Sequence, residues 1–206
     1  LERVGTVQAS LHQYARTFQP PENFIRPSRD WLRVLSPDAR IVENIIDSPS
    51  ARGLFYATDE LLLKKAAEYA WEWISSATLD PTQYGLVHGD LQQAHYVFYR
   101  GNVHVLGFDD CGYDYFLSDS AVTLQGLAGR ADEPALRKAY WQGYERVLAA
   151  PAHADTLVNA FSIAHMLYRL QELILAPDSS MDRNEVALYL KRHRDTLSRI
   201  VSTSTL

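Results

Sequence analysis

The sequence predicts a mainly α-helical protein with one small antiparallel β-hairpin near its middle. Apolar residues recur at helical spacing in the opening segment and in later segments near 117–129, 133–150, 153–175 and 181–201. Residues 96–99 and 103–108 are typical of two short strands, and Arg100-Gly101-Asn102 is typical of the turn that joins a hairpin. A chain of 206 residues can bury one core, so we expect residues 1–206 to form a single domain.

The first helix is predicted to run to about Phe18, because Gln19-Pro20-Pro21 cannot continue it. Its apolar face follows from steps of three and four and consists of Val4, Val7, Leu11, Tyr14 and Ala15. After a loop, Asp30 is a suitable N-cap for a short helix that carries Trp31 and Leu35.

A long helix is predicted from about Thr58 to Ala77. Asp59 and Glu60 suit its first turn, since carboxylates are favourable at the N-terminus of a helix. The residues that share its apolar face are Leu62, Ala66, Tyr69, Ala70 and Trp73.

The charge balance excludes some classes of partner. The formal net charge is −5 and the sequence has no basic run, whereas a nucleic-acid-binding surface needs clustered Lys and Arg. The apolar stretches are short and are interrupted by His, Arg or Gln, and nothing resembles a signal peptide. We therefore expect no nucleic-acid or membrane partner and a cytoplasmic location. The one cysteine, Cys111, is expected to be a packed small residue rather than a reactive thiol.

Charged residues gather around the predicted hairpin. His88-Gly89-Asp90 follows a short β-like segment, Leu86-Val87, which places the Asp90 carboxylate on a tight loop. Positions 107 and 109 lie on one face and Phe108 points the other way, because strand side chains alternate. Carboxylates that converge on one pocket can hold a divalent metal ion or act as a base.

This order of motifs resembles the aminoglycoside phosphotransferase and choline kinase-like family. The matching features are His88-Gly89-Asp90-Leu91 before a hairpin, Phe-Asp-Asp-Cys-Gly-Tyr at 108–113, and Asp119 beyond it. The sequence at 108–113 is most similar to bacterial stress-response kinases and type II homoserine kinases. The opening helix, with Gly5 and Leu11-His12, resembles the first helix of the family's C-terminal lobe. The resemblance thus implies that the whole chain is the C-lobe of a protein-kinase-like fold.

The resemblance implies an ATP-dependent kinase, assisted by Mg²⁺, that phosphorylates a small-molecule hydroxyl. Asp90 corresponds to the catalytic aspartate, which orients the hydroxyl and accepts its proton. His88 corresponds to a structural residue of the catalytic loop. Asp119 would tie that loop to the following helix by hydrogen bonds.

Two positions depart from the family pattern. His95 stands at a cofactor-binding position where the family has a metal-binding asparagine, and Gly107 stands where it has a metal-binding aspartate. Mg²⁺ prefers hard oxygen ligands, whereas an imidazole favours zinc-like metals and glycine offers no side chain. Asp109 is the residue we expect to replace the lost metal ligand, with Asp110 as second choice.

A further departure is that the family's N-terminal β-rich lobe, which clamps ATP, has no counterpart in the sequence. No Gly-rich loop or strand-borne lysine is found, and Lys64 and Lys65 lie on a predicted helix. The chain opens with Leu1 directly in helix-like sequence, so we expect it to be a fragment or to lack its N-terminal part. A C-lobe alone should expose apolar surface, and we therefore expect self-association or a separate N-lobe as partner.

Three functional hypotheses follow. The first is a small-molecule phosphotransferase, impaired by its altered metal site. The second is a pseudokinase-type binding or scaffolding module that has lost phosphoryl transfer. The third is a metal-dependent hydrolase that uses His88, Asp90, His95 and Asp109.

Each site residue also has a purely structural interpretation. Asp90 could cap nearby backbone amides, and His95 could simply pack beside Tyr96. Tyr113, Tyr115 and Phe116 could line a substrate pocket, but such aromatic residues are more often part of a core.

Overall fold

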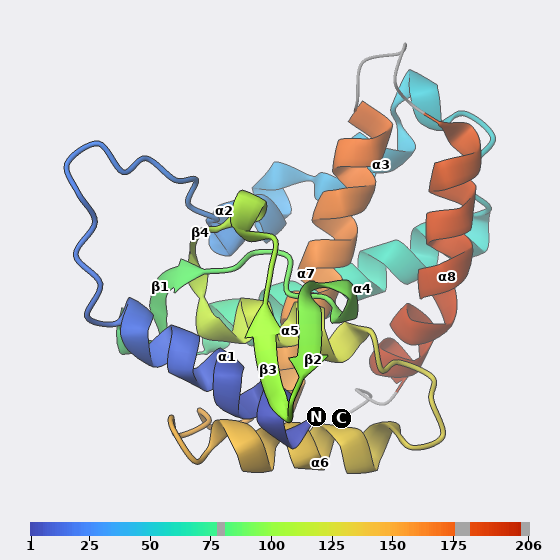
Figure 1. Cartoon of the computed structure of the whole chain (residues 1–206). Helices are drawn as coiled ribbons and strands as arrows, with labels where there is room; N and C mark the ends of the chain where they lie inside the picture. Colours follow the sequence, from blue (N-terminus) through green and yellow to red (C-terminus); the bar gives the residue numbers. More distant parts are fainter. Residues whose placement is uncertain (78–80, 176–181, 203–206) are drawn as a thin grey trace. The chain divides into compact units, whose positions relative to one another are not determined.

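The computed structural model describes residues 1–77, 81–175 and 182–202. Contacts divide the chain into two compact units, which are described separately below. The first consists of the described residues of Leu1–Arg29 and Thr78–Val158, and the second of those of Asp30–Ala77 and Asn159–Leu206. Both are mainly helical, and short antiparallel strands occur in the first, so the predicted fold class is confirmed (Figure 1). The single domain stays a prediction.

The described part of the first unit combines helices with four short strands. Its helices are α1 (Glu2–Ala15), α5 (Phe116–Gln125) and α6 (Glu133–Tyr144). Its strands are β1 (Tyr84–Val87), β2 (Tyr96–Tyr99), β3 (Asn102–Val105) and β4 (Gly112–Tyr115). Single-turn 3₁₀ helices lie at Pro81–Gln83, Gln93–His95 and Phe108–Asp110. Its largest fully buried side chains are Leu91, Phe116, Leu124, Tyr140 and Tyr144.

Helix α1 is confirmed as a helix, but it ends at Ala15 rather than near Phe18, and of its predicted apolar face only Val4 is buried. It packs against α6 (Figure 1), where the Thr6 hydroxyl donates to the Gly143 carbonyl at 3.0 Å. The residues that α1 buries are Val4, Gly5, Gln8, Ala9 and His12, whereas Tyr14 is 67% exposed. Apolar periodicity missed this face because Gln8 and His12 are polar, and both find hydrogen-bond partners inside the unit.

The strands form two separate antiparallel pairs. The predicted hairpin is confirmed as β2 with β3, and its two turn residues, Arg100 and Gly101, both have positive φ, as a type I′ turn requires. The other pair joins β1 to β4, with Val87 opposite Gly112. Strand β4 was not predicted, because its partner lies far away in the sequence.

The described part of the second unit is helical. It contains α2 (Trp31–Leu35), α3 (Ile41–Ile46), α4 (Ala57–Ser76), most of α7 (Ala154–Leu175) and α8 (Arg183–Ser202). Single-turn 3₁₀ helices lie at Pro37–Ala39 and Pro49–Ala51. The predicted cap of α2 is confirmed, since the Asp30 carboxylate accepts from the Arg33 backbone N–H at 3.0 Å.

Helix α4 begins close to the predicted residue, but its first turn is closed differently. Tyr56 is the N-cap, and its backbone N–H donates to the Asp59 carboxylate at 3.0 Å. Ala66, Tyr69 and Ala70 are buried as predicted. Leu62 and Trp73 are only half-buried, because the buried face of α4 is rotated towards Leu63 and Ile74.

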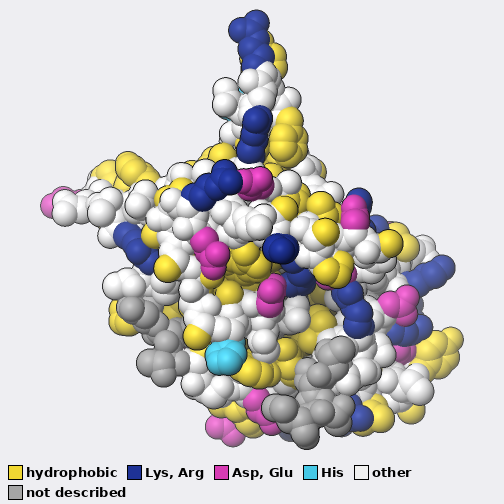
Figure 2. Space-filling model, turned by 90° about the horizontal axis from the view of Figure 1, so that it is seen from below, with side chains coloured by type: hydrophobic (Ala, Val, Ile, Leu, Met, Phe, Trp, Pro, Cys, Tyr) yellow, Lys and Arg dark blue, Asp and Glu magenta, His cyan; other side chains and the backbone are white. Residues whose placement is uncertain are grey.

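The surface carries charges of both signs. Figure 2 shows acidic and basic side chains interspersed among apolar and neutral ones on the face that it presents, a pattern typical of a water-facing surface. Within the described ranges, no helix is both long and apolar enough to span a membrane.

Candidate active site

The loop that carries Asp90 follows directly after strand β1. Val87 is the buried last residue of β1, and the chain then turns through His88 and Gly89. Gly89 has a φ of +86°, which side chains disfavour, and a Cβ atom there would clash with the Asp110 carbonyl oxygen. Only glycine therefore lets this loop lie directly on the 3₁₀ turn Phe108–Asp110.

Asp119 holds this loop through its backbone. One carboxylate oxygen accepts from the His88 N–H and the other from the Gly89 N–H, each at 2.8 Å. Asp119 lies near the start of α5 and is buried, so both bonds are shielded from water. Asp119 thus links the Asp90 loop to α5, and its assignment as a site residue stays a prediction.

The Asp119 carboxylate is ionised despite its burial. Desolvation alone would raise its pKa, but the hydrogen bond and charge of His12, together with the two backbone donors, outweigh this effect and lower the pKa below its ordinary value. His12 Nε2 lies 3.4 Å from the Asp119 carboxylate. A buried negative charge is therefore fixed behind the Asp90 loop.

His88 connects the loop to the end of the hairpin. Its Nε2 lies 2.8 Å from the Leu106 carbonyl oxygen, which can only accept, so Nε2 carries the proton. Its Nδ1 accepts from the Asp90 N–H at 3.3 Å. The ring is buried and packs beside Phe108, with ring centres 4.7 Å apart. These contacts agree with a structural role.

The Asp90 side chain remains accessible. It is 36% exposed, and one carboxylate oxygen accepts from the Gln92 side-chain amide at 3.0 Å. The backbone of Asp90 forms two hydrogen bonds: its N–H donates to His88 and its carbonyl oxygen accepts from His95. A carboxylate on a fixed backbone and open to solvent can accept a proton from an incoming hydroxyl.

His95 is packed against the Asp90 loop. Its Nδ1 donates to the Asp90 carbonyl oxygen at 2.6 Å, and the same nitrogen lies 3.7 Å from the Asp90 carboxylate. The ring also lies near the His88 ring, with centres 5.5 Å apart. One of its two nitrogens is thus already engaged by the backbone.

The strand predicted to extend to Phe108 is wrong. β3 ends at Val105, Gly107 has a left-handed backbone with φ 78° and ψ 53°, and Phe108–Asp110 form a 3₁₀ turn. Strand alternation therefore cannot place Asp109 on the same face as residue 107. Asp109 and Asp110 are both exposed, and the Asp109 carbonyl accepts from Arg26 at 3.1 Å.

Positions 95 and 107 do not fit the Mg²⁺ ion that the resemblance implies. Mg²⁺ needs oxygen ligands, but His95 offers nitrogen and Gly107 offers no side chain. Within residues 1–77, 81–175 and 182–202, no three His, Cys, Asp or Glu side chains converge closely enough to hold a metal ion. The cluster imagined for a hydrolase therefore does not form. The assignment of Asp109 and Asp110 as metal ligands stays a prediction.

Buried polar residues behind the Asp90 loop support it, and the sequence did not single them out. The Thr123 hydroxyl donates to the Leu91 carbonyl at 2.7 Å, and the Tyr96 hydroxyl lies 2.9 Å from Thr123. Burial raises the pKa of Tyr96, which keeps it neutral. Tyr140 donates to the Gln8 side-chain carbonyl at 2.7 Å. The available signal was the pair of polar residues on α1, Gln8 and His12, one helical turn apart.

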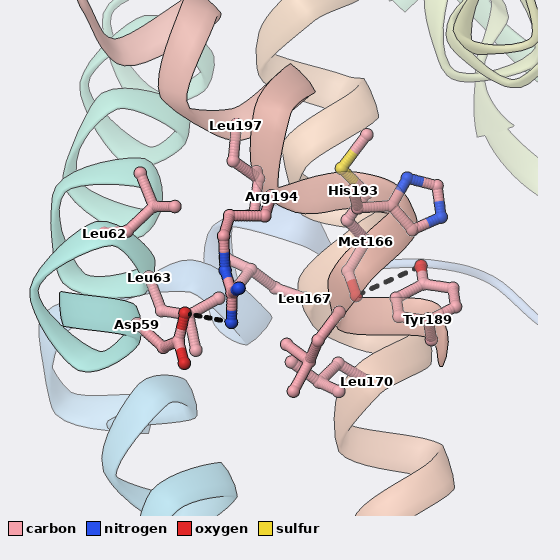
Figure 3. A pocket seen from close by; sticks show the side chains of 11 residues that line it. Asp59, Leu62, Leu63, Met166, Leu167, Leu170, Tyr189, His193, Arg194 and Leu197 are labelled. Atoms are coloured by element: carbon pink, nitrogen blue, oxygen red, sulfur yellow. Dashed lines mark hydrogen bonds and ion pairs between the residues drawn. The ribbon is translucent and has the colours of Figure 1, made fainter. Parts of the chain in front are cut away.

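A separate pocket lies within the second unit (Figure 3). It is lined mainly by leucines of α4, α7 and α8, and its volume, including its opening to solvent, is about 360 Å³. At its edge Arg194 reaches the Asp59 carboxylate at 2.7 Å, and the Tyr189 hydroxyl donates to the Met166 carbonyl at 3.4 Å. Burial and the neighbouring Arg192 lower the pKa of His193 to about 4.

Known structures share this fold. A microcompartment-associated aminopropanol kinase has a TM-score of 0.75 at 20% identity, covering 98% of this chain and 62% of that protein. An amicoumacin kinase in complex with AMP-PNP, Ca²⁺ and Ami has a TM-score of 0.65 at 15% identity, covering 98% and 58%. A choline/ethanolamine kinase family protein from Mesorhizobium loti has a TM-score of 0.60 at 14% identity, covering 98% and 65%. The chain thus spans less than two thirds of each of these proteins.

Comparison with curated proteins finds no matching sequence. The structural matches place the described fold among kinase-like folds, as a C-lobe. A sequence profile of the phosphotransferase enzyme family matches residues 1–156, which is more than half of the chain. The chain therefore belongs to the phosphotransferase enzyme family.

Proposed function

We propose that this chain is the catalytic-loop lobe of an ATP-dependent phosphotransferase that acts on a small-molecule hydroxyl, and that transfer is impaired. The observation that carries the proposal is the anchoring of the Asp90 loop. Asp119 accepts from the backbone of His88 and Gly89, and this leaves the Asp90 carboxylate fixed and accessible. Purely structural capping would not need the carboxylate to face solvent.

In the proposed reaction, ATP donates the phosphoryl group. The acceptor hydroxyl hydrogen-bonds to Asp90, its oxygen attacks the γ-phosphorus as the bond to the β-phosphate oxygen breaks, and ADP leaves. The hydroxyl proton passes to Asp90, which is the general base. Any Mg²⁺ that accompanies ATP would have Asp109 and Asp110 as its side-chain ligands.

The second candidate function is a pseudokinase-type module that binds a partner or ligand without transferring phosphate. The observation that favours it concerns His95 and Gly107, which lie against each other. Neither residue has a side-chain oxygen that could bind a metal ion. ATP binding that requires a metal ion would favour the phosphotransferase, and ATP binding without a metal ion would favour the pseudokinase-type module. Calorimetric titration with ATP alone, and then with Mg²⁺ or Mn²⁺, measures both.

The phosphotransferase proposal is tested by product formation. The chain is incubated with radiolabelled ATP and a panel of amino alcohols, choline-like alcohols and aminoglycosides. We expect slow formation of a phosphorylated product, reduced about 10²- to 10⁴-fold in Asp90→Ala and Asp90→Asn, since a general base contributes on that scale. Asp38→Ala, which removes an exposed carboxylate in the second unit, is the control. Product at the same rate in Asp90→Ala would refute the proposal, and no product with any acceptor would favour the second candidate.

We also propose a partner for the exposed apolar side chains of the hairpin and the segment after it. These are Val97, Phe98, Tyr99, Leu106 and Phe108, which are 40–66% exposed. The related structures extend well beyond the part that this chain matches. A separate N-lobe is therefore the proposed occupant, and self-association is the alternative outcome. The proposed location is the cytoplasm, where ATP is available.

A further inference from the structure

The His95 ring lies directly against Gly107. A Cβ atom at position 107 would lie 3.0 Å from both Cδ2 and Nε2 of His95, closer than ordinary van der Waals contact. Any side chain at 107 would therefore require the ring to shift by a few tenths of an ångström. The two residues compete for one volume, although twelve positions separate them in the sequence.

The His95 ring is fixed in this position from several directions. Its Nδ1 donates to the Asp90 carbonyl at 2.6 Å, and the His88 ring lies alongside it. Its own backbone carbonyl accepts from the Leu106 N–H at 3.0 Å, which ties it to the residue that precedes Gly107. Swinging the ring away from position 107 would break a short hydrogen bond to the loop of Asp90.

We infer that His95 and Gly107 are one coupled substitution: the imidazole fills the space of a side chain at 107, so an oxygen-lined cation site can be opened here only by changing both residues. A hard cation needs carboxylate or amide oxygens, and neither residue supplies one. If Gly107 alone is replaced, the new side chain contacts the His95 ring. If His95 alone is replaced, position 107 still has no side chain to bind a cation. The inference concerns the site of the proposed function and rests on it only for the choice of cation.

The backbone at position 107 is already suited to an aspartate. Its φ of 78° and ψ of 53° are left-handed, a conformation that aspartate and asparagine tolerate better than other side chains. Once the ring is removed, an aspartate can therefore be placed without remodelling the loop. The double variant His95→Asn/Gly107→Asp should fold better than Gly107→Asp alone.

Stability measurements test the coupling without any ligand. Gly107→Ala is compared with Gly129→Ala in the wild-type and His95→Ala backgrounds, because Gly129 has a similar φ of +80° but nothing within 4 Å of its Cβ position. Circular dichroism gives the midpoint of thermal unfolding. In the wild-type background, we expect Gly107→Ala to lower the midpoint more than Gly129→Ala does. In the His95→Ala background, we expect the two glycine changes to lower it by the same amount. Equal shifts in wild type, or a difference that persists in His95→Ala, would overturn the coupling.

Ion binding tests the cation site itself. Binding of Mn²⁺, alone and with ADP, is followed by the loss of the free-ion electron paramagnetic resonance signal in wild type, both single variants and the double variant. We expect the double variant to bind at least about tenfold more tightly than either single variant, since altering even a partner of a metal ligand changes affinity about 10- to 100-fold. A gain in Gly107→Asp equal to that of the double variant, or no gain in the double variant, would overturn the inference.

These outcomes are independent of the proposed function. Folding and Mn²⁺ binding are measured without an acceptor, whereas the phosphotransferase proposal depends on a phosphorylated product that requires Asp90. If the chain forms a product that depends on Asp90 but shows no coupling between residues 95 and 107, the proposed function is supported and the inference is refuted. If the chain shows the coupling but forms no product, the inference is supported and the proposed function is refuted.

Discussion

The imidazole of His12 and the carboxylate of Asp119 lie 3.4 Å apart in the interior of the first unit. His12 Nδ1 is 2.9 Å from the Tyr144 hydroxyl, and the ring stacks on Phe116 with centres 4.5 Å apart. Asp119 in turn accepts from the backbone of His88 and Gly89. A continuous buried chain of contacts therefore runs from α6 and α1 to the Asp90 loop.

Asp119→Ala should destabilise the first unit strongly. It leaves the N–H groups of His88 and Gly89 without their acceptor, and an unsatisfied buried donor costs about 1–3 kcal/mol. We expect a loss of about 2–5 kcal/mol in the free energy of unfolding, measured by urea denaturation.

His12→Phe is the matched partner for this measurement, because it keeps a ring on Phe116 and removes both hydrogen bonds. The double variant should lose less stability than the sum of the two single changes, as expected for contacting residues. Strict additivity would show that His12 and Asp119 act separately.

Acid should remove the contribution of Asp119. Its pKa is lowered in the folded state, so its stabilising effect is fully present above the ordinary value of 3.8 and is lost as the pH falls through the lower folded pKa. The difference in unfolding free energy between wild type and Asp119→Ala should therefore be constant from pH 7 to about 4.5 and shrink below pH 4. A difference that stays constant down to pH 2 would contradict this assignment.

His193 should make the second unit acid-sensitive at a higher pH. Burial, then the charge of Arg192, lowers the pKa of His193 from 6.5 to about 4. Between these values the unfolded chain binds a proton that the folded chain does not, so stability falls as the pH drops from 6.5 towards 4. His193→Gln should weaken this decline, whereas His104→Gln, which removes an exposed histidine, should not. Thermal unfolding at half-unit pH steps measures the effect.

The Asp59 carboxylate should matter more than a surface ion pair. Its side chain is 5% exposed, it closes the first turn of α4 through the Tyr56 N–H, and it accepts from Arg194 at 2.7 Å. We expect Asp59→Ala to cost about 1–3 kcal/mol, because a lost cap costs about 0.5–2 and the pair adds to it. Arg194→Met keeps most of the packing and should cost about 1 kcal/mol or less, since Arg194 is half-exposed. If urea denaturation showed that Asp59→Ala and Arg194→Met lower the free energy of unfolding equally, this prediction would be contradicted.

The exposed hairpin side chain Phe98 should promote association. Phe98 is 66% exposed on β2, opposite Val103 of β3, so most of its ring faces solvent. Phe98→Ser should therefore leave the unfolding midpoint nearly unchanged and reduce any self-association seen by light scattering. A wild-type chain that is monomeric at high concentration, with no N-lobe polypeptide bound to it, would contradict the proposed partner.

Local sequence determined the helices, the hairpin and the chemistry of the loop. Asp30 caps α2, and Gly101 permits the turn of the hairpin; each acts within a few residues, so each is readable without a fold. The sequences of 88–91 and 108–113 on either side of the hairpin, together with Asp119, were enough to predict the family, which the profile match confirms.

Only the tertiary structure decided which face of α1 is buried, where β3 ends and what fills the space at position 107. The Gln8 side-chain oxygen and the His12 ring accept partners from other elements, and apolar periodicity cannot register such partners. β3 ends at Val105, Gly107 has a left-handed backbone before the 3₁₀ turn, and its neighbour is His95, which lies on another segment. Local propensity acts over one turn, whereas packing and buried hydrogen bonds join residues that are distant along the chain, so these features depend on the folded structure.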